Sequence, residues 1–166
     1  LPLVLYNIPG RTGVNMLPTT IARLTALPTI VGVKEGSGSV QQASDLVQMC
    51  GDRLTVLAGD DALTLPMMAV GGKGVITVTA NIVPAEMARL VAAFTEGKIE
   101  EARRIHFKLS PLFSALFFET NPIPVKEALS LMGKIDPELR LPLCPMAQDT
   151  REKLVQVLKD ASLITR

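Results

Sequence analysis

A lysine ends the apolar run in "TIVGVKEGSG", residues 29 to 38, where a buried strand would ordinarily end in an uncharged residue. Because side chains alternate along a strand, Ile30, Gly32 and Lys34 share one face, and Gly32 leaves space beneath the amine. A lysine held in such a low-dielectric site favours its neutral form, which attacks carbonyl carbon and forms a Schiff base. The alternative is a lysine that has left the strand for a solvated turn.

A tyrosine and an arginine lie close together in "YNIPGRTG", residues 6 to 13, directly after another apolar run. The hydroxyl of Tyr6 could relay protons, and the guanidinium of Arg11 could hold a carboxylate through paired hydrogen bonds. Taken alone, the segment also fits a tight turn with an aromatic plug and a surface arginine. Together with Lys34, it favours a site for carbonyl chemistry.

Two further segments contain glycine without forming a nucleotide-binding motif. In "LAGDDALT", Gly59, Asp60 and Asp61 follow a strand, and carboxylates at that position favour helix capping over catalysis. "GGKGVITVTAN" lacks the spacing of a phosphate-binding loop, so nucleotide binding is not expected. We expect the stretch from Gly74 to Ile76 to present main-chain groups to a small ligand instead.

Short apolar runs alternate with segments of helical spacing along the first part of the chain. The expected strands are Pro2 to Tyr6, Ile30 to Lys34, Leu54 to Ala58 and Gly74 to Val78. Helical spacing begins after each of them, at Pro18, Val40, Asp61 and Pro84. Strands that are apolar on both faces and alternate with helices predict a parallel sheet covered by helices.

Four βα units fit a small doubly wound sheet or half of a (β/α)8 TIM barrel. The chain opens inside the apolar run "LPLVLYN" without an initiator methionine, and this favours the C-terminal half of a barrel within a longer protein. The later part has helical spacing throughout. We therefore expect an α/β half-barrel over residues 1–96 and a C-terminal helical region over residues 97–166.

The composition is that of a soluble globular protein, with 48% hydrophobic and 20% charged residues. The net charge of +1 predicts no binding to nucleic acid or to a membrane surface. Cys50 and Cys144 lie far apart without CxxC spacing, which favours free thiols in a reducing cytoplasm over a disulfide or a metal site. His106, the only histidine, is expected to be structural.

The order and spacing of "LYNIPGRTG", "VGVKEGSG", "LAGDD", "GGKGVITVTAN" and "ETNPIPVKEAL" resemble the second half of the bacterial dihydrodipicolinate synthase family, over the whole chain. The resemblance implies the last four βα units of a (β/α)8 barrel and the family's C-terminal helices. It makes Lys34 the Schiff-base lysine and Tyr6 the proton relay. It also implies that Arg11 binds a substrate carboxylate, that Ile76 contacts pyruvate and that Gly59 lies near the barrel mouth.

The resemblance further implies a lyase of lysine biosynthesis. It would condense pyruvate with L-aspartate semialdehyde to 4-hydroxy-tetrahydrodipicolinate in the cytoplasm, without a metal or an organic cofactor. The family assembles as homotetramers built from tight dimers. Its threonine pair and its second tyrosine lie outside the matched half, so we expect the 166 residues alone to be inactive.

Two alternatives stay open at this point. N-acetylneuraminate lyase and the keto-deoxy-sugar-acid aldolases belong to the same superfamily and share the tyrosine and the lysine, but they generally lack an arginine at the position of Arg11. A non-catalytic half-barrel that pairs its open edge with another chain is the alternative from a different functional class.

Overall fold

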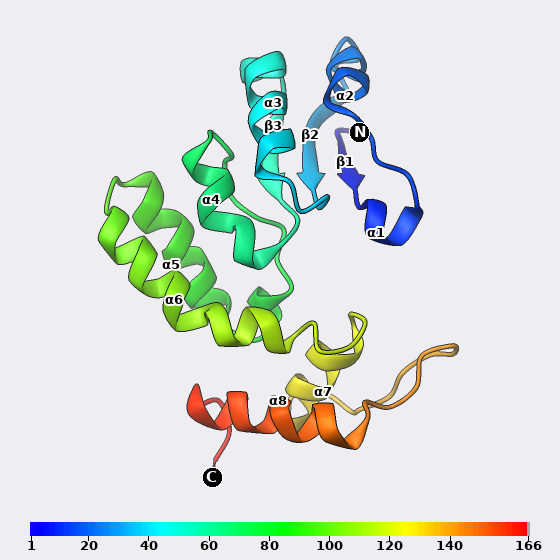
Figure 1. Cartoon of the computed structure of the whole chain (residues 1–166), viewed down its shortest axis with the longest axis vertical. Coiled ribbons are helices and arrows are strands. Elements are labelled where there is room, and N and C mark those ends of the chain that lie inside the picture. The colour runs from blue at the N-terminus through cyan, green and yellow to red at the C-terminus, as the bar shows by residue number, and fades with distance from the viewer. Residues whose placement is uncertain (166) are drawn as a thin grey trace. The chain divides into compact units, whose positions relative to one another are not determined.

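A computed structural model describes residues 1–165 of the chain, which packs into two compact units (Figure 1). The first unit comprises Leu1–Thr77 with Phe94–Gly97, and the second comprises Val78–Ala93 and the chain from Lys98 onward. The boundary predicted from the sequence, between a half-barrel over residues 1–96 and a C-terminal helical region, stays a prediction.

The first unit holds a parallel sheet with helices beside it. Within residues 1–165 the sheet has three strands in the order β1-β2-β3, namely β1 (Leu3–Asn7), β2 (Ile30–Glu35) and β3 (Thr55–Ala58). The helices of this unit are α1 (Pro9–Thr12), α2 (Pro18–Leu24), α3 (Val40–Cys50) and α4 (Thr64–Ala69), with short 3₁₀ turns at Gly51–Arg53 and Asp61–Leu63. The predicted parallel sheet is confirmed.

The predicted fourth strand, Gly74 to Val78, is wrong as a regular strand. Residues 73–76 do run beside β3, because the Lys73 amide donates to Val56 O and the Ile76 amide donates to Ala58 O. However, the pairing amounts to an isolated parallel bridge between Ala58 and Val75. Glycine, which has low strand propensity, interrupts the segment, and Gly74 takes a positive φ of 151°.

The core of the first unit lies between the sheet and its helices. Val33 of β2 and Val56 of β3 are 0% and 2% exposed, and they pack with Leu46 and Ala43 of α3. Helix α3 begins where the sequence predicts, because the side chain of Ser39 accepts a hydrogen bond from the Gln42 amide. This packing attaches β2 and β3 to α3.

The second unit is helical and has its own core. It contains most of α5 (Pro84–Thr95), a 3₁₀ turn at Thr79–Asn81, α6 (Ile99–Ala115), α7 (Ile123–Leu131) and α8 (Gln148–Asp160). Its core includes Ile82, Leu112, Leu116, Leu154 and Leu158, and Met87 and Leu90 of α5 are also buried. The helical character predicted for the later part of the chain is confirmed.

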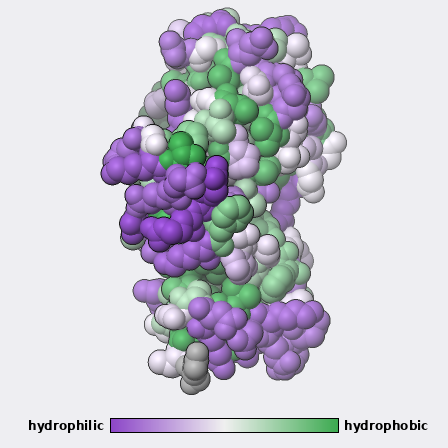
Figure 2. Space-filling view, turned by 60° about the vertical axis from the view of Figure 1, so that its left-hand side comes forward, coloured by the Kyte–Doolittle hydropathy of each residue, from purple (hydrophilic) through white to green (hydrophobic). Residues whose placement is uncertain are grey.

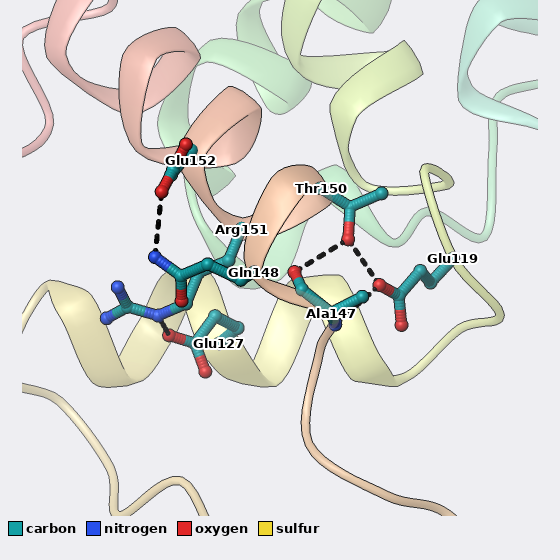
Figure 3. Close-up of polar contacts among 7 residues, drawn as sticks. All are labelled: Glu119, Glu127, Ala147, Gln148, Thr150, Arg151 and Glu152. Atoms are coloured by element: carbon teal, nitrogen blue, oxygen red, sulfur yellow. Dashed lines mark hydrogen bonds and ion pairs between the residues drawn. The ribbon is translucent and has the colours of Figure 1, made fainter.

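Polar contacts attach α8 to the chain before it (Figure 3). Glu119, which lies between α6 and α7, accepts hydrogen bonds from the Ala147 amide and the Thr150 hydroxyl at the start of α8. Arg151 of α8 pairs with Glu127 of α7 at 2.7 Å. A carboxylate at a helix amino terminus satisfies unpaired amides and interacts favourably with the helix dipole, so Glu119 caps α8 from outside the helix.

Charged side chains cover the outer surface of the helical unit, and Figure 2 shows strongly hydrophilic surface over α5 and α6. Arg89 and Lys108 pair with Glu101 and Glu86 across these two helices, at 2.5 and 3.1 Å. The hydrogen bond from Arg89 lowers the pKa of the Glu101 carboxyl. No helix in residues 1–165 is both long enough and apolar enough to span a bilayer.

Replacing Glu119 with alanine should weaken the helical unit by about 1 to 2 kcal/mol, since the amino terminus of α8 loses its acceptor. Urea unfolding followed by circular dichroism measures the loss. Glu152→Ala is the matched control. Glu152 is exposed, and within residues 1–165 it accepts a hydrogen bond only from Gln148, four residues earlier on the same helix. Equal losses in the two variants would refute the capping role.

The stability of the helical unit should fall as the pH drops below about 6.5, the usual pKa of histidine. His106 lies edge-on to the rings of Phe107 and Phe113, and burial lowers its pKa. The unfolded chain therefore takes up a proton at a pH where the folded chain does not, and this favours unfolding until the pH reaches the folded pKa. Between pH 7.5 and 5.5, the melting temperature of wild type should fall more than that of His106→Leu. Equal falls in the two proteins would contradict this prediction.

Candidate functional site

Tyr6 and Lys34 are brought together by the pairing of β1 with β2. The two residues are direct partners in the parallel register, and Lys34 in turn is opposite Leu57 of β3. Lys34 Nζ lies over the Tyr6 ring, 4.2 Å from its centroid. Attraction between an ammonium and an aromatic face is worth about 0.5–1 kcal/mol at exposed sites, so the contact helps to hold the two side chains side by side.

The exposure of the pair suits a reactive site rather than a core contact. Lys34 is half-buried and Tyr6 is 45% exposed, so neither side chain is enclosed in the core of the first unit. Val33, the neighbour of Lys34 on the opposite face of β2, is fully buried. Along the rest of β2, burial does not follow the predicted alternation, because Ile30, on the face of Lys34, is 7% exposed and Val31, on the face of Val33, is 40% exposed.

Arg11 lies in the short helix α1, directly after β1. Pro9 occupies the first turn of this helix, and Gly13 ends it with a φ of 72° and an amide bonded to Pro9 O at 2.9 Å. The side chain of Arg11 is exposed. The sequence predicts a turn at this position, and the structure has one turn of helix at the same end of the sheet as Lys34.

The main-chain amides of Gly59 and Ile76 bond to the carboxyl ends of β2 and β3. The Gly59 amide donates to Glu35 O at 2.7 Å, directly after Lys34, and the Ile76 amide donates to Ala58 O at 2.9 Å. Ile76 is 40% exposed. Gly59 thus lies beside β2, the strand that carries Lys34, and Ile76 lies beside β3.

Two glycines allow the strand ends to approach each other closely. A Cβ atom at Gly59 would lie 2.9 Å from both Glu35 O and Gly36 Cα, closer than real Cβ contacts occur. A Cβ atom at Gly36 would lie 3.0 Å from Asn7 O and 3.2 Å from Cε2 of Tyr6. The glycines therefore set the spacing of the backbone around Tyr6 and Lys34.

The sequence analysis missed a buried polar cluster on the opposite face of the same strand ends. The carboxylate of Glu35, 0% exposed, accepts hydrogen bonds from Asn7 Nδ2 at 3.0 Å, Gln42 Nε2 at 2.9 Å and the Ser37 amide at 2.6 Å. Asn15 bonds to both Asn7 and Gln42. Glu35, Asn7, Gln42 and Asn15 are called the buried amide cluster below.

A signal for this cluster was present in the sequence. Glu35 lies two positions after Val33 in β2, so its side chain is on the same face of the sheet, the face that the helices cover. Asn7 holds the equivalent position at the end of β1. A carboxylate on a buried face requires hydrogen-bond donors, so the positions of Glu35 and Asn7 indicate a polar cluster on this face.

Among residues 1–165, no group of three or more histidine, cysteine, aspartate or glutamate side chains lies close enough to hold a metal ion. Both cysteines are free thiols, and burial raises the pKa of Cys50.

Comparison with known proteins gives one consistent result. The sequence profile of the dihydrodipicolinate synthetase family matches residues 1–161. The 4-hydroxy-tetrahydrodipicolinate synthase of Thermodesulfovibrio yellowstonii is 58% identical over 164 residues, which are 99% of this chain and 56% of that protein. The chain thus spans a little over half the length of the relatives it matches.

Solved structures agree with the sequence comparison. The dihydrodipicolinate synthase of Aquifex aeolicus is 43% identical, with a TM-score of 0.96 over 100% of this chain and 57% of that one. The chloride-inhibited dihydrodipicolinate synthase of Acinetobacter baumannii, solved in complex with pyruvate, is 43% identical, with a TM-score of 0.95 over 99% of this chain and 56% of that one. The fold is therefore part of the TIM barrel of these proteins.

Replacing Gly59 with alanine should lower the free energy of unfolding by about 1–3 kcal/mol, because β2 and β3 must separate to admit the methyl group. Gly10→Ala is the matched control, since no atom lies within 4 Å of a Cβ at that position. Urea unfolding measures both variants. A Gly59→Ala protein as stable as Gly10→Ala would show that the strand ends tolerate wider spacing.

Proposed function

Because this chain belongs to the dihydrodipicolinate synthetase family, we propose that it carries the lysine-bearing part of a 4-hydroxy-tetrahydrodipicolinate synthase. The single observation that supports the proposal most strongly is the amine of Lys34 over the ring of Tyr6, at the carboxyl ends of two parallel strands. The carboxyl ends of barrel strands are where TIM-barrel enzymes place their active sites.

The proposal includes closure of the sheet into an eight-stranded barrel, of which this chain forms the C-terminal half. Within residues 1–165, β1 pairs with β2 alone, and Leu3 and Val4 on β1 are 52% and 49% exposed. Apolar side chains on an open sheet edge favour pairing with a further strand. Residues 73–76 extend the sheet beyond β3 and would lead to the opposite closing edge.

The first chemical step is attack of the neutral Lys34 amine on the ketone carbon of pyruvate. A new C–N bond forms, the carbonyl oxygen takes a proton, and loss of that oxygen as water gives an imine. We assign the proton shuttle to Tyr6, and the contact of its ring with the amine supports this assignment. The imine carbon is then more electrophilic than the ketone was, because its nitrogen is protonated.

Carbon–carbon bond formation follows from that imine. Loss of a methyl proton gives an enamine, whose carbon attacks the aldehyde of L-aspartate semialdehyde. Arg11 holds the carboxylate of that aldehyde through a bidentate pair. The substrate amine then attacks the imine carbon, and the C–N bond to Lys34 breaks, so the ring closes and Lys34 is free again. The imine nitrogen serves as the electron sink, so the chemistry needs neither a metal nor an organic cofactor.

The remaining parts of the proposal follow from the family. Pyruvate is supported by its presence in the Acinetobacter baumannii structure. We also expect assembly with further copies, as dimers of dimers, and a cytoplasmic location.

Pyruvate followed by borohydride should add one reduced adduct to the protein, at Lys34, and mass spectrometry of peptides locates it. The protein to use is this chain completed with the part of the Thermodesulfovibrio yellowstonii synthase that it does not match. Lys34→Arg is the control, because it keeps the charge and cannot form the imine. An adduct at a different lysine, or none at all, would refute the mechanism.

The choice between synthase and sugar-acid lyase is tested at Arg11. In the same completed protein, Arg11→Ala should raise KM for L-aspartate semialdehyde at least tenfold, the scale of one lost charge-assisted hydrogen bond of about 1.5–3 kcal/mol. KM for pyruvate should change little. Arg23→Ala is the control, since Arg23 is also exposed, at the end of α2. An enzyme indifferent to Arg11→Ala would favour the lyase.

The 166-residue chain alone should show no measurable synthase activity, because the proposed relay needs groups from the rest of the barrel. A coupled assay at high protein concentration tests this, with the completed protein as the positive control. Turnover by the chain alone would overturn the proposed division of the site.

A further inference from the structure

The carboxylate of Glu35 is buried, and the proposed mechanism does not use it. It is 0% exposed, and its oxygens meet nitrogen donors of Asn7, Gln42 and Ser37. All of these donors are uncharged groups. A charge enclosed without a counter-ion is expensive, and apolar residues could fill the same volume. Stability alone therefore does not account for an acid at this position.

The donors around Glu35 require a carboxylate rather than an amide. Asn7 Nδ2 points at both oxygens, at 3.3 and 3.0 Å, and Gln42 Nε2 and the Ser37 amide approach one oxygen each. A carboxylate offers acceptor sites on both oxygens and no donor, so it accepts all of these bonds. Glutamine would turn an N–H group toward at least one donor and leave it unsatisfied.

The cluster joins the three segments that carry the proposed reactive groups. Asn7 follows Tyr6 directly in β1, and Glu35 follows Lys34 directly in β2, so each reactive side chain lies on one face while its neighbour lies on the other. The Gly36 amide also donates to Asn7 O at 2.8 Å. A shift of either strand end would break the hydrogen bonds of Glu35.

The loop that carries Arg11 is held by the same cluster. Asn7 Oδ1 accepts from the Met16 amide at 2.9 Å, and Asn15 bonds to Asn7 and to Gln42. Both ends of the segment from Ile8 to Met16 are thus attached to Asn7. The buried amide cluster therefore ties the ends of β1 and β2 to this loop and, through Gln42, to the first turn of α3.

From this arrangement we propose that Glu35 is a positioning residue for the Schiff-base reaction, which aligns Lys34 with Tyr6 from the opposite face of the sheet. The inference rests on the proposed function and adds to it a residue that never touches substrate. Its chemical role is to fix the register of the two strand ends, so that the amine meets the ketone and the phenol in one geometry. A misplacement of 1 Å can reduce a rate about 10²-fold.

The test compares the rate of pyruvate adduct formation in variants of the completed protein, by borohydride quenching at timed intervals under saturating pyruvate. Glu35→Gln should slow adduct formation about 10- to 100-fold, while the pyruvate concentration at half-saturation changes little. Asn7→Asp combined with Glu35→Gln should restore most of the rate. The carboxylate then lies on β1 instead of β2, and the side-chain amides can exchange their donor and acceptor atoms.

Val33→Ala is the matched control for stability. Val33 is fully buried on the same face of β2, and it belongs to the apolar core rather than to the buried amide cluster. It should lower the urea midpoint and leave the rate of adduct formation essentially unchanged. If Glu35→Gln fails to fold, Gln42→Met removes one donor to Glu35 and should slow adduct formation severalfold, whereas an unchanged rate would overturn the inference.

Several results contradict the inference without touching the proposed function. One is a wild-type rate in folded Glu35→Gln. Another is a Val33→Ala protein that slows as much as Glu35→Gln, which would make the effect one of stability. A third is a double variant that stays as slow as Glu35→Gln. Failure of the wild-type protein to form an adduct at Lys34 would instead refute the proposed function.

Discussion

A carboxylate enclosed within a protein must be met by hydrogen-bond donors, and in this chain that requirement fixes where neighbouring strands end. The acceptor is Glu35, and its donors come from the end of β1, from the turn after β2 and from the first turn of α3. Because the donors lie on separate segments, the bonds form together only in one register. The rest of the candidate site depends on that register.

The two faces of the strand ends therefore have different tasks. One face carries Tyr6 and Lys34, which are both partly exposed. The other face holds the polar groups that keep the strands aligned, beneath α3. Gly36 and Gly59 make this possible, because any larger residue would push the backbones apart. In the proposed reaction, the Lys34 amine is therefore exposed to substrate and still held in position.

Much of this organisation could be predicted from the sequence, and the failures have physical reasons. The apolar run predicted the strand that carries Lys34, and helical spacing predicted the start of α3 at Val40. The strand expected at residues 74–78 fails because pairing at a glycine-rich segment depends on its neighbours. The partners of Glu35 and Glu119 could not be predicted, since they come from residues as far as 31 positions away. Sequence spacing carries no information about such contacts.

The alignment of Lys34 with Tyr6 can be measured directly by NMR. Tyr6 is the only tyrosine of the chain, and the chain has no tryptophan, so few rings can shift the lysine resonances. With Nζ 4.2 Å from the ring centroid, ring current should move the ε-methylene protons of Lys34 upfield. Our account predicts this shift in wild type and its loss in folded Glu35→Gln. The same upfield shift in both proteins would contradict the claim that the buried carboxylate aligns the pair.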